Sequence, residues 1–250
     1  MSRRRASRAA AHSAGALLAV RNGIARIDLP HARVAPSVAQ RICDAAEQIA
    51  FDETVRVAVL RGAPPAFCLG VEPDGDGGPD WIAAIADLTV PVIVALDGGA
   101  IAEGAELALA GDIRIAGPRA FLAFPQVSGG RLPRHGATQR LPRLIGRTRA
   151  MELLLSGRRA GAREALRIGL VTAVAPSPAV AARRLATALA AKGPVALRLA
   201  KEAVVRSGDL PLADGLRLEQ DLYVLLQTTE DRAEGVRAFL SGRRPRFRGR

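Results

Sequence analysis

The pattern of apolar and polar positions divides the chain into a first part in which strands and helices alternate and a last third that is nearly all helix. Short apolar runs of strand length predict strands at 17–20, 24–29, 55–60, 90–96, 113–116, 121–124 and 171–174. Apolar residues at helical spacing predict helices at 37–50, 81–88, 102–110, 138–145, 148–155, 163–168, 178–192, 194–205, 211–227 and 230–240. This order predicts an α/β sheet followed by a helical C-terminal region.

Turn-forming residues mark several of the connections. Asn22-Gly23 separates the first two apolar runs, and Asn-Gly at such a place predicts a β-hairpin. The runs 55–60 and 90–96 are continuously apolar, as expected of strands that are buried on both faces of a sheet. The Gly-, Pro- and Asp-rich stretch 70–80 predicts a loop. No linker is long enough to require two independent domains.

Composition restricts the kind of core and the kind of partner. Hydrophobic residues make up 49% of the 250 residues but aromatic residues only 3%, so the core must be built from Ala, Val, Leu and Ile. So few aromatic side chains argue against a platform on which nucleic-acid bases stack. No apolar run approaches the roughly 18 residues that a membrane-spanning helix needs. Cys43 and Cys68 are too few for a disulfide framework or a zinc site, and no metal is expected.

The net charge of +12 lies mostly at the two ends of the chain, and without the end arginines only about three net charges remain. These arginines are Arg3, Arg4, Arg5, Arg8, Arg243, Arg244, Arg246, Arg248 and Arg250. We therefore expect solvated basic tails rather than a nucleic-acid groove, and RNA binding through the tails stays open as an alternative. Residues 1–16 are expected to be a disordered basic tail of a cytoplasmic protein.

Two junctions between a strand and a glycine-rich turn carry candidate chemistry. The first is the segment 66–72, which follows a buried strand, and the second is 98–106, which leads from another buried strand into a helix. Such junctions leave backbone N–H groups without partners. Two of them facing each other could bind an oxyanion.

The segments resemble the enoyl-CoA hydratase/isomerase (crotonase) superfamily from about residue 17 to the end. The resemblance rests on VRVAVLRGAPPAFCLGVE, PVIVALDGGAIAEGAELALAGDIRIAG, FPQVSGG, GATQRLPRLIGRTRAMELLLSGRR, AREALRIGLV and TEDRAEGVRAFLSGRRPRF. It implies a crotonase-like spiral of β-β-α units in residues 17–177. It also implies that the helical region 178–250 assembles the chain into a homotrimer or a dimer of trimers.

The same resemblance implies an oxyanion hole that holds a thioester carbonyl. The backbone N–H groups of Val71 and Glu103 fall at its two positions, and a backbone donor does not depend on the side chain. The substrate-binding residues expected around them are Ala66, Cys68, Gly70, Gly104 and Arg134. Coenzyme A would enter as part of the substrate, and no separate cofactor is expected.

The family's hydratases place two glutamates across the substrate's Cα–Cβ bond, and here the resemblance gives Glu106 and Gln126. Gln126 can hydrogen-bond a water or hydroxyl but cannot exchange a proton as a carboxyl group does. Where the family has a run of glycines, this chain has Ala102-Glu103-Gly104. We interpret Glu103 as a first-turn acid that suits the helix dipole rather than as a second base. His135 is expected to be structural.

These residues predict an enzyme, a lyase of the enoyl-CoA hydratase type, with Glu106 as its acid/base and Gln126 as a positioning residue. Isomerisation, decarboxylation or C–C cleavage on the same oxyanion hole stays open, with Arg134 able to bind a substrate carboxylate. A non-catalytic acyl-CoA-binding homologue is a further alternative. The segment 29–33, which shapes the CoA pocket in relatives, is shortened, so the thioester could belong to coenzyme A or to an acyl-carrier protein. Neither a membrane nor a nucleic acid is expected as a partner.

Overall fold

The computed structural model describes residues 17–72 and 78–250. The predicted basic tail 1–16 and the middle of the predicted loop 70–80 lie outside the described residues. The helices are α1 (Pro36–Phe51), α2 (Trp81–Ala86), α3 (Glu103–Ala110), α4 (Ala137–Ile145), α5 (Arg147–Ser156), α6 (Ala162–Arg167), α7 (Pro178–Ala190), α8 (Pro194–Arg206), α9 (Leu212–Gln227) and α10 (Glu230–Leu240), with a short 3₁₀ helix η1 (Pro125–Gly129).

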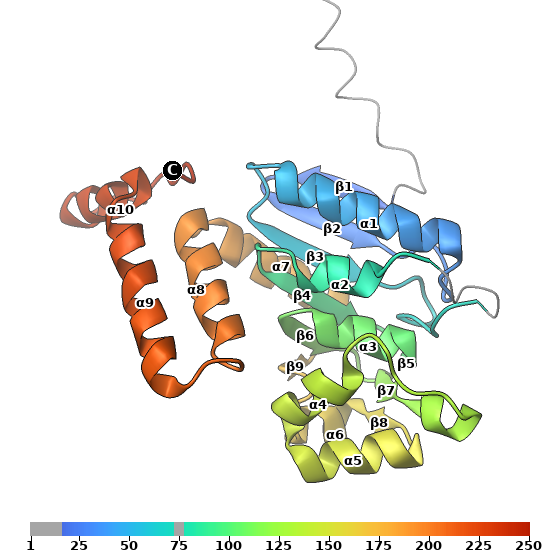
Figure 1. Ribbon diagram of the computed structural model, residues 1–250. Coiled ribbons are helices and arrows are strands. Elements are labelled where there is room, and N and C mark those ends of the chain that lie inside the picture. The colour runs from blue at the N-terminus through green and yellow to red at the C-terminus, as the bar shows by residue number, and fades with distance from the viewer. Residues whose placement is uncertain (1–16, 73–77) are drawn as a thin grey trace, which may run out of the picture.

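The strands form a large, mostly parallel sheet and a small second one (Figure 1). The large sheet has the order β1 (Leu18–Arg21), β2 (Ile24–Asp28), β3 (Val57–Arg61), β4 (Val92–Leu96), β6 (Ile113–Ala116) and β9 (Ala173–Val174). The small sheet has the order β5 (Gly99–Ile101), β7 (Phe121–Ala123) and β8 (Ala160–Gly161). Strands next to each other in sequence, such as β4 and β5, lie in different sheets, which gives the predicted spiral of β-β-α units.

The first hairpin is confirmed. β1 pairs with β2 antiparallel, and the two turn residues, Asn22 and Gly23, have φ values of 54° and 74°. Positive φ at both central positions is the conformation that Asn-Gly favours, because it matches the twist of the flanking strands.

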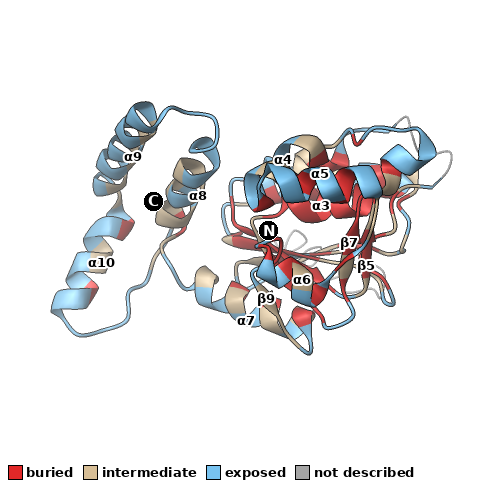
Figure 2. Ribbon diagram, turned by 90° about the horizontal axis from the view of Figure 1, so that it is seen from below, coloured by how far each residue is buried: buried red, intermediate tan, exposed pale blue. Residues whose placement is uncertain are grey.

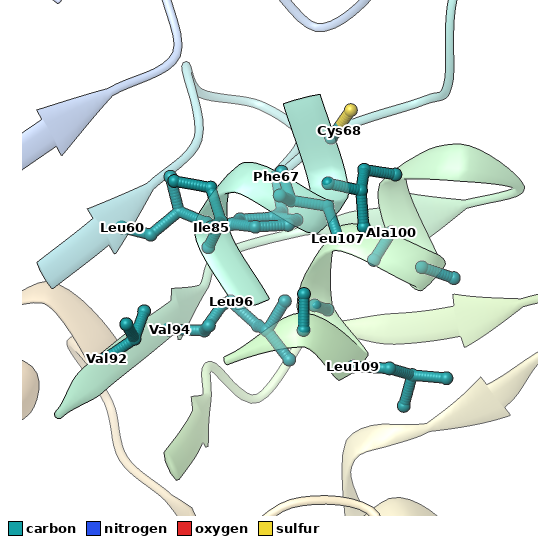
Figure 3. Packing of buried hydrophobic residues seen from close by; sticks show 14 of the residues in the cluster. Leu60, Phe67, Cys68, Ile85, Val92, Val94, Leu96, Ala100, Leu107 and Leu109 are labelled. Atoms are coloured by element: carbon teal, nitrogen blue, oxygen red, sulfur yellow. The ribbon is translucent and has the colours of Figure 1, made fainter. Parts of the chain in front are cut away.

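Both faces of the large sheet are buried. Successive side chains of a strand point to opposite faces, so each strand contributes to both. On one face, Leu60 of β3 and Val94 of β4 join the main core together with residues of α1, α2 and α3 (Figure 3). On the other face, Val59 and Ile93 from the same two strands contact Ala182 of α7. The continuously apolar sequences of β3 and β4 follow from this double covering.

The small sheet was only partly predicted. The sequence predicts a glycine-rich turn at Gly98-Gly99, but residues from Gly99 onward form β5 and pair in parallel with β7. A Cβ at Gly99 would lie 2.7 Å from the ring of Phe121, so glycine here allows a close approach between strands rather than only a turn. β8 could not be predicted either, because its two residues are too few to show a strand pattern. It is a strand only through its pairing with β7.

Helices α8, α9 and α10 extend away from the two sheets, and Figure 2 shows most of their surface as exposed. Lys201 of α8 ties this arm to the sheet, since its Nζ lies 2.7 Å from Asp112 Oδ2 and donates to the carbonyl oxygen of Val90 at 3.0 Å. Asp112 Oδ2 also accepts the N–H of Val92.

The C-terminal residues, expected as a solvated tail, fold back on α10. Asp231 is buried and accepts the backbone N–H groups of Arg248 and Gly249 at 2.6 and 2.8 Å. Arg243 forms a two-point ion pair with Glu234. The acidic first half of α10 therefore offsets part of the basic charge at this end. Within the described residues, no helix is both long and apolar enough to cross a membrane.

Replacement of Lys201 by Met should lower the free energy of unfolding by about 2–3 kcal/mol, because it removes a charged, mostly buried partner from Asp112 while keeping the apolar stem. Denaturant unfolding measures this change. The control is Arg206→Ala on the same helix, which breaks an exposed pair with Glu202 and should cost less than about 1 kcal/mol. Equal effects of the two variants would contradict this role of Lys201.

Candidate active site

Backbone hydrogen bonds join the two predicted strand-to-turn junctions. Cys68 and Ala100 form a parallel bridge, in which the N–H of Cys68 donates to Gly99 O at 3.1 Å and the N–H of Ile101 donates to Cys68 O at 2.9 Å. A Cβ at Gly104 would lie only 2.1 Å from Cys68 O, so the start of α3 can approach this turn only with glycine there. The two segments that carry Val71 and Glu103 are therefore held side by side.

The shortened segment before α1 supports Val71. The N–H of Val34 donates to Gly70 O at 3.0 Å, and the N–H of Glu72 donates to Val34 O at 3.1 Å. Arg33 Nη1 donates to Val71 O at 3.1 Å. Val71 is thus fixed through its own carbonyl and through both neighbouring residues. No sequence pattern predicts this contact, because it joins segments about 35 residues apart that carry no pairing motif.

Ala66, Cys68 and Gly70 are buried in the same turn. Burial raises the pKa of the Cys68 thiol to about 12, so it remains a thiol at neutral pH. Cys68 therefore packs in the core as a small apolar residue and not as a thiolate nucleophile.

Glu103 lies in the first turn of α3, but its side chain is turned inward. The residue is 5% exposed, and its Oε2 accepts the N–H of Val71 at 3.4 Å. Its Oε1 lies 3.7 Å from Nη1 of Arg131, whose side chain is exposed. The carboxylate therefore faces the predicted oxyanion hole, a position that the dipole argument did not foresee.

Ala102 precedes α3 with φ 53° and ψ −120°, a conformation that suits glycine. An alanine in this region is strained by about 1–3 kcal/mol. The departure from a glycine run, visible in the sequence, is thus a real conformational cost.

Glu106 is 1% exposed and every contact of its carboxylate is defined. Its Oε1 accepts the N–H groups of His135 and Ala137 at 2.8 and 3.1 Å, and its Oε2 accepts from Gln126 Nε2 at 3.2 Å. Burial raises the pKa of Glu106 above its ordinary value, and the two backbone N–H groups oppose this rise. The result is a positioned carboxyl group that holds a proton more readily than an exposed glutamate.

Gln126, in η1, is 2% exposed and lies against Glu106 as the sequence predicted from the resemblance. Its Oε1 is buried and has no hydrogen-bond partner among the described residues. A buried, unsatisfied acceptor is costly. A water or a substrate hydroxyl that donates to this oxygen would remove the cost.

The turn that holds Glu106 is supported from outside by a side-chain hydrogen bond that the sequence did not reveal. His135 Nδ1 lies 3.0 Å from Asp80 Oδ1, and the same oxygen caps α2 by accepting the N–H of Ala83. Arg134 Nε donates to His135 Nε2 at 3.2 Å, and Arg134 is exposed. His135 therefore has the structural role expected of it. The helix cap at Asp80 is readable from sequence, but its contact with His135 is not.

Comparisons with known proteins find similarity over most of the chain. The family model described as "Enoyl-CoA hydratase/isomerase" matches residues 20–250. The chain is 36% identical to the 2,3-dehydroadipyl-CoA hydratase of Escherichia coli over 82% of this chain and 85% of that protein. It is 38% identical to the (E)-benzylidenesuccinyl-CoA hydratase of Thauera aromatica, over 79% and 83% of the two chains. A crystal structure of enoyl-CoA hydratase from Mycobacterium tuberculosis superposes with a TM-score of 0.89 at 30% identity, covering 95% of this chain and all of that one.

Replacement of Ala102 by glycine should raise the free energy of unfolding by about 1 kcal/mol, because relief of the positive-φ strain exceeds the loss of one buried methyl group. Thermal or denaturant unfolding measures the change. The matched control is Ala105→Gly, three residues along in regular helix, which should lower stability by about 1 kcal/mol. A loss of stability in both variants would show that Ala102 is not strained.

Proposed function

Because the chain belongs to the enoyl-CoA hydratase/isomerase family and has the crotonase fold that its sequence predicted, we propose that it is a lyase that adds water to an enoyl thioester or removes it. The observation that carries this proposal is the buried pair of Glu106 and Gln126, in which one carboxyl group is positioned and one amide oxygen still needs a donor.

Two backbone N–H groups would stabilise the enolate. The amides of Val71 and Glu103 belong to the two segments that the bridge between Cys68 and Ala100 joins, and the Glu103 N–H, at the first position of a helix, has no acceptor within that helix. The hydrogen bonds from these donors would strengthen as negative charge develops on the thioester oxygen. Because the donors are already oriented, no reorganisation is needed. Loss of one such donor typically raises the barrier by about 2.7–4 kcal/mol.

Glu106 would serve as the single acid/base. Gln126 Oε1 would accept a hydrogen bond from one O–H of a water molecule. The water oxygen then bonds to Cβ while Glu106 takes the other proton of that water. The electrons of the double bond move onto the thioester oxygen as an enolate. Glu106 then returns the proton to Cα, so that one water has been added in total. The raised pKa of Glu106 favours a group that can hold the proton between the two steps.

We propose a coenzyme A thioester as the substrate, with no separate cofactor. Both hydratases named above carry CoA thioesters in their names, which favours coenzyme A over a carrier protein. The shortened segment before α1 also remains ordered against Gly70 and Glu72, which removes part of the argument against a CoA site.

Double-bond isomerisation is the second candidate, and the single carboxylate favours it. Moving a proton from one carbon to another needs one base and no water, so Gln126 is no obstacle to that reaction. Product analysis with 2-enoyl and 3-enoyl thioesters separates the two. Decarboxylation, acyl-CoA binding without turnover, and RNA binding through the arginine-rich ends remain alternatives with tests of their own: a carboxylated thioester, acyl-CoA binding, and the salt dependence of RNA binding.

We also propose that the chain assembles as a homotrimer or a dimer of trimers through the helical region 178–250. None of the residues of α9 is buried, although Leu216, Tyr223, Val224 and Leu225 are apolar and more than half exposed. Apolar surface of this kind on a helix that stands away from the core marks a protein interface. A second copy of the same region is the partner that the family implies.

Replacement of Glu106 by Gln should lower the turnover of crotonyl-CoA by about 10²–10⁴-fold, because the acid/base is lost. Loss of the conjugated enoyl absorbance measures the rate. The fold should survive, since Gln126 can turn its amide and offer its oxygen to the new side chain. Because burial raises the pKa of Glu106 above 4.5, its ionised form opposes folding, and this penalty grows as the pH rises above that value. The variant should therefore gain stability relative to wild type at neutral pH.

Glu152→Gln, which removes an exposed carboxylate on α5, is the control and should leave turnover unchanged. Full hydratase activity in Glu106→Gln would refute the role of Glu106. If wild type lacks hydratase activity but isomerises 3-enoyl thioesters, the second candidate function replaces the first.

Leu225→Asp should dissociate the assembly, because it places a charge on the exposed apolar surface of α9. Light scattering coupled to gel filtration should give three or six times the chain mass of 26.2 kDa for wild type and a smaller mass for the variant. Leu132→Asp, at an exposed leucine outside the helical region, should keep the wild-type mass. A monomeric wild type at micromolar concentration would contradict the proposal.

A further inference from the structure

Glu103 contributes two groups to one site with opposite effects. Its backbone N–H is a proposed donor to the thioester oxygen, while its side-chain carboxylate accepts the N–H of the other proposed donor, Val71. A backbone N–H has one proton, and an N–H shared between two acceptors bonds each of them less well. The carboxylate of Glu103 therefore competes with the substrate for Val71.

The carboxylate fills the space in front of this turn. Glu103 is 5% exposed, and a Cβ at Gly70 would lie 2.6 Å from its Oε2. The turn of Gly70 and Val71 is thus covered by the carboxylate rather than open. A negatively charged group at this place also repels an enolate oxygen, which carries the same sign of charge.

The contacts that hold the carboxylate are long. The bond from Val71 measures 3.4 Å, longer than the usual 2.7–3.2 Å, and the ion pair of Oε1 with Arg131 measures 3.7 Å. Arg131 directly follows Gly130 at the end of η1, and its side chain is 55% exposed. A rotation of the Glu103 side chain toward Arg131 would exchange the weak bond to Val71 for a shorter ion pair at the surface.

We propose that the carboxylate of Glu103 occupies the oxyanion hole of the free protein and that a thioester oxygen displaces it toward Arg131. This inference rests on the proposed function, because it concerns the same two amides. Glu103 and Arg131 would then both influence substrate affinity. A chain with glycine at position 103 would not show this effect, because glycine has no carboxylate to displace.

The test is calorimetric binding of butyryl-CoA, a saturated thioester that cannot be hydrated. Glu103→Ala keeps the backbone donor and removes the competitor, so it should bind butyryl-CoA about tenfold more tightly than wild type, the factor expected for loss of one competing hydrogen bond. Glu103→Gln should lie between the two. Glu72→Gln removes an exposed acid from the same turn and should bind as wild type does, which separates competition from a general change in charge.

Arg131 is tested by a double-mutant cycle. Arg131→Ala should weaken butyryl-CoA binding several-fold, because the displaced carboxylate loses its new partner. In the Glu103→Ala background the same change should have no effect, since Arg131 acts only through Glu103. An equal effect of Arg131→Ala in both backgrounds would show that Arg131 contacts the ligand directly.

The outcomes separate this inference from the proposed function. If wild type binds and hydrates thioesters but Glu103→Ala binds butyryl-CoA no more tightly, the proposed function stands and the displacement is refuted. If Glu103→Ala binds more tightly while no variant hydrates crotonyl-CoA, the displacement stands and hydration is refuted. If neither wild type nor Glu103→Ala binds butyryl-CoA, both are refuted. Thermal unfolding shows whether Glu103→Ala is misfolded. In that case, the contact is tested in Glu103→Gln labelled with ¹⁵N-valine, by comparing the amide chemical shift of Val71 with that of wild type. An unchanged shift would refute the contact.

Discussion

The pairing of Cys68 with Ala100 is the interaction on which the site depends. It joins the turn after β3 to the strand before α3, and so holds the segment of Val71 beside that of Glu103, which comes about 30 residues later in the chain. The pairing is possible only because Gly104 has no side chain, since a Cβ there would clash with the carbonyl oxygen of Cys68. The large sheet fixes where β3 and β4 end, and this bridge converts those two ends into one site.

Within that frame, burial determines the chemistry of α3. Glu103 and Glu106 both lie in its first turn and are almost completely buried, an unusual place for two acids. Backbone N–H groups stabilise both: His135 and Ala137 donate to Glu106, and Val71 donates to Glu103. The side-chain partner of Glu106 is the neutral Gln126, and the second buried acid of α3 is Glu103. The carboxylate of Glu106 is fixed by three hydrogen bonds, whereas that of Glu103 has only long contacts and is freer to move.

The C-terminal arm follows a different principle. α7 covers the sheet with small residues such as Ala182, whereas α8 to α10 expose apolar side chains. Polar contacts such as the ion pair of Lys201 with Asp112 and the hydrogen bond from Arg56 to Phe247 O join this C-terminal region to the sheet. The arm is therefore fixed in direction without being buried. This combination suits a surface that completes its core by contact with other chains.

The sequence by itself determined the elements and the family. The ranges predicted for α1, α10 and β6, the Asn22-Gly23 hairpin and the pair Glu106 and Gln126 agree with the structure, because each depends on local periodicity, on turn residues or on a motif within one segment. Only the tertiary structure decided what those segments meet. The small sheet, the support of Val71 by Val34, the hydrogen bond between Asp80 and His135 and the inward turn of Glu103 all join positions far apart in sequence, and no local pattern encodes such contacts. A first-turn glutamate suits a helix dipole equally well whether it faces water or the site, and only the packing of α3 against the turn of Gly70 settles which.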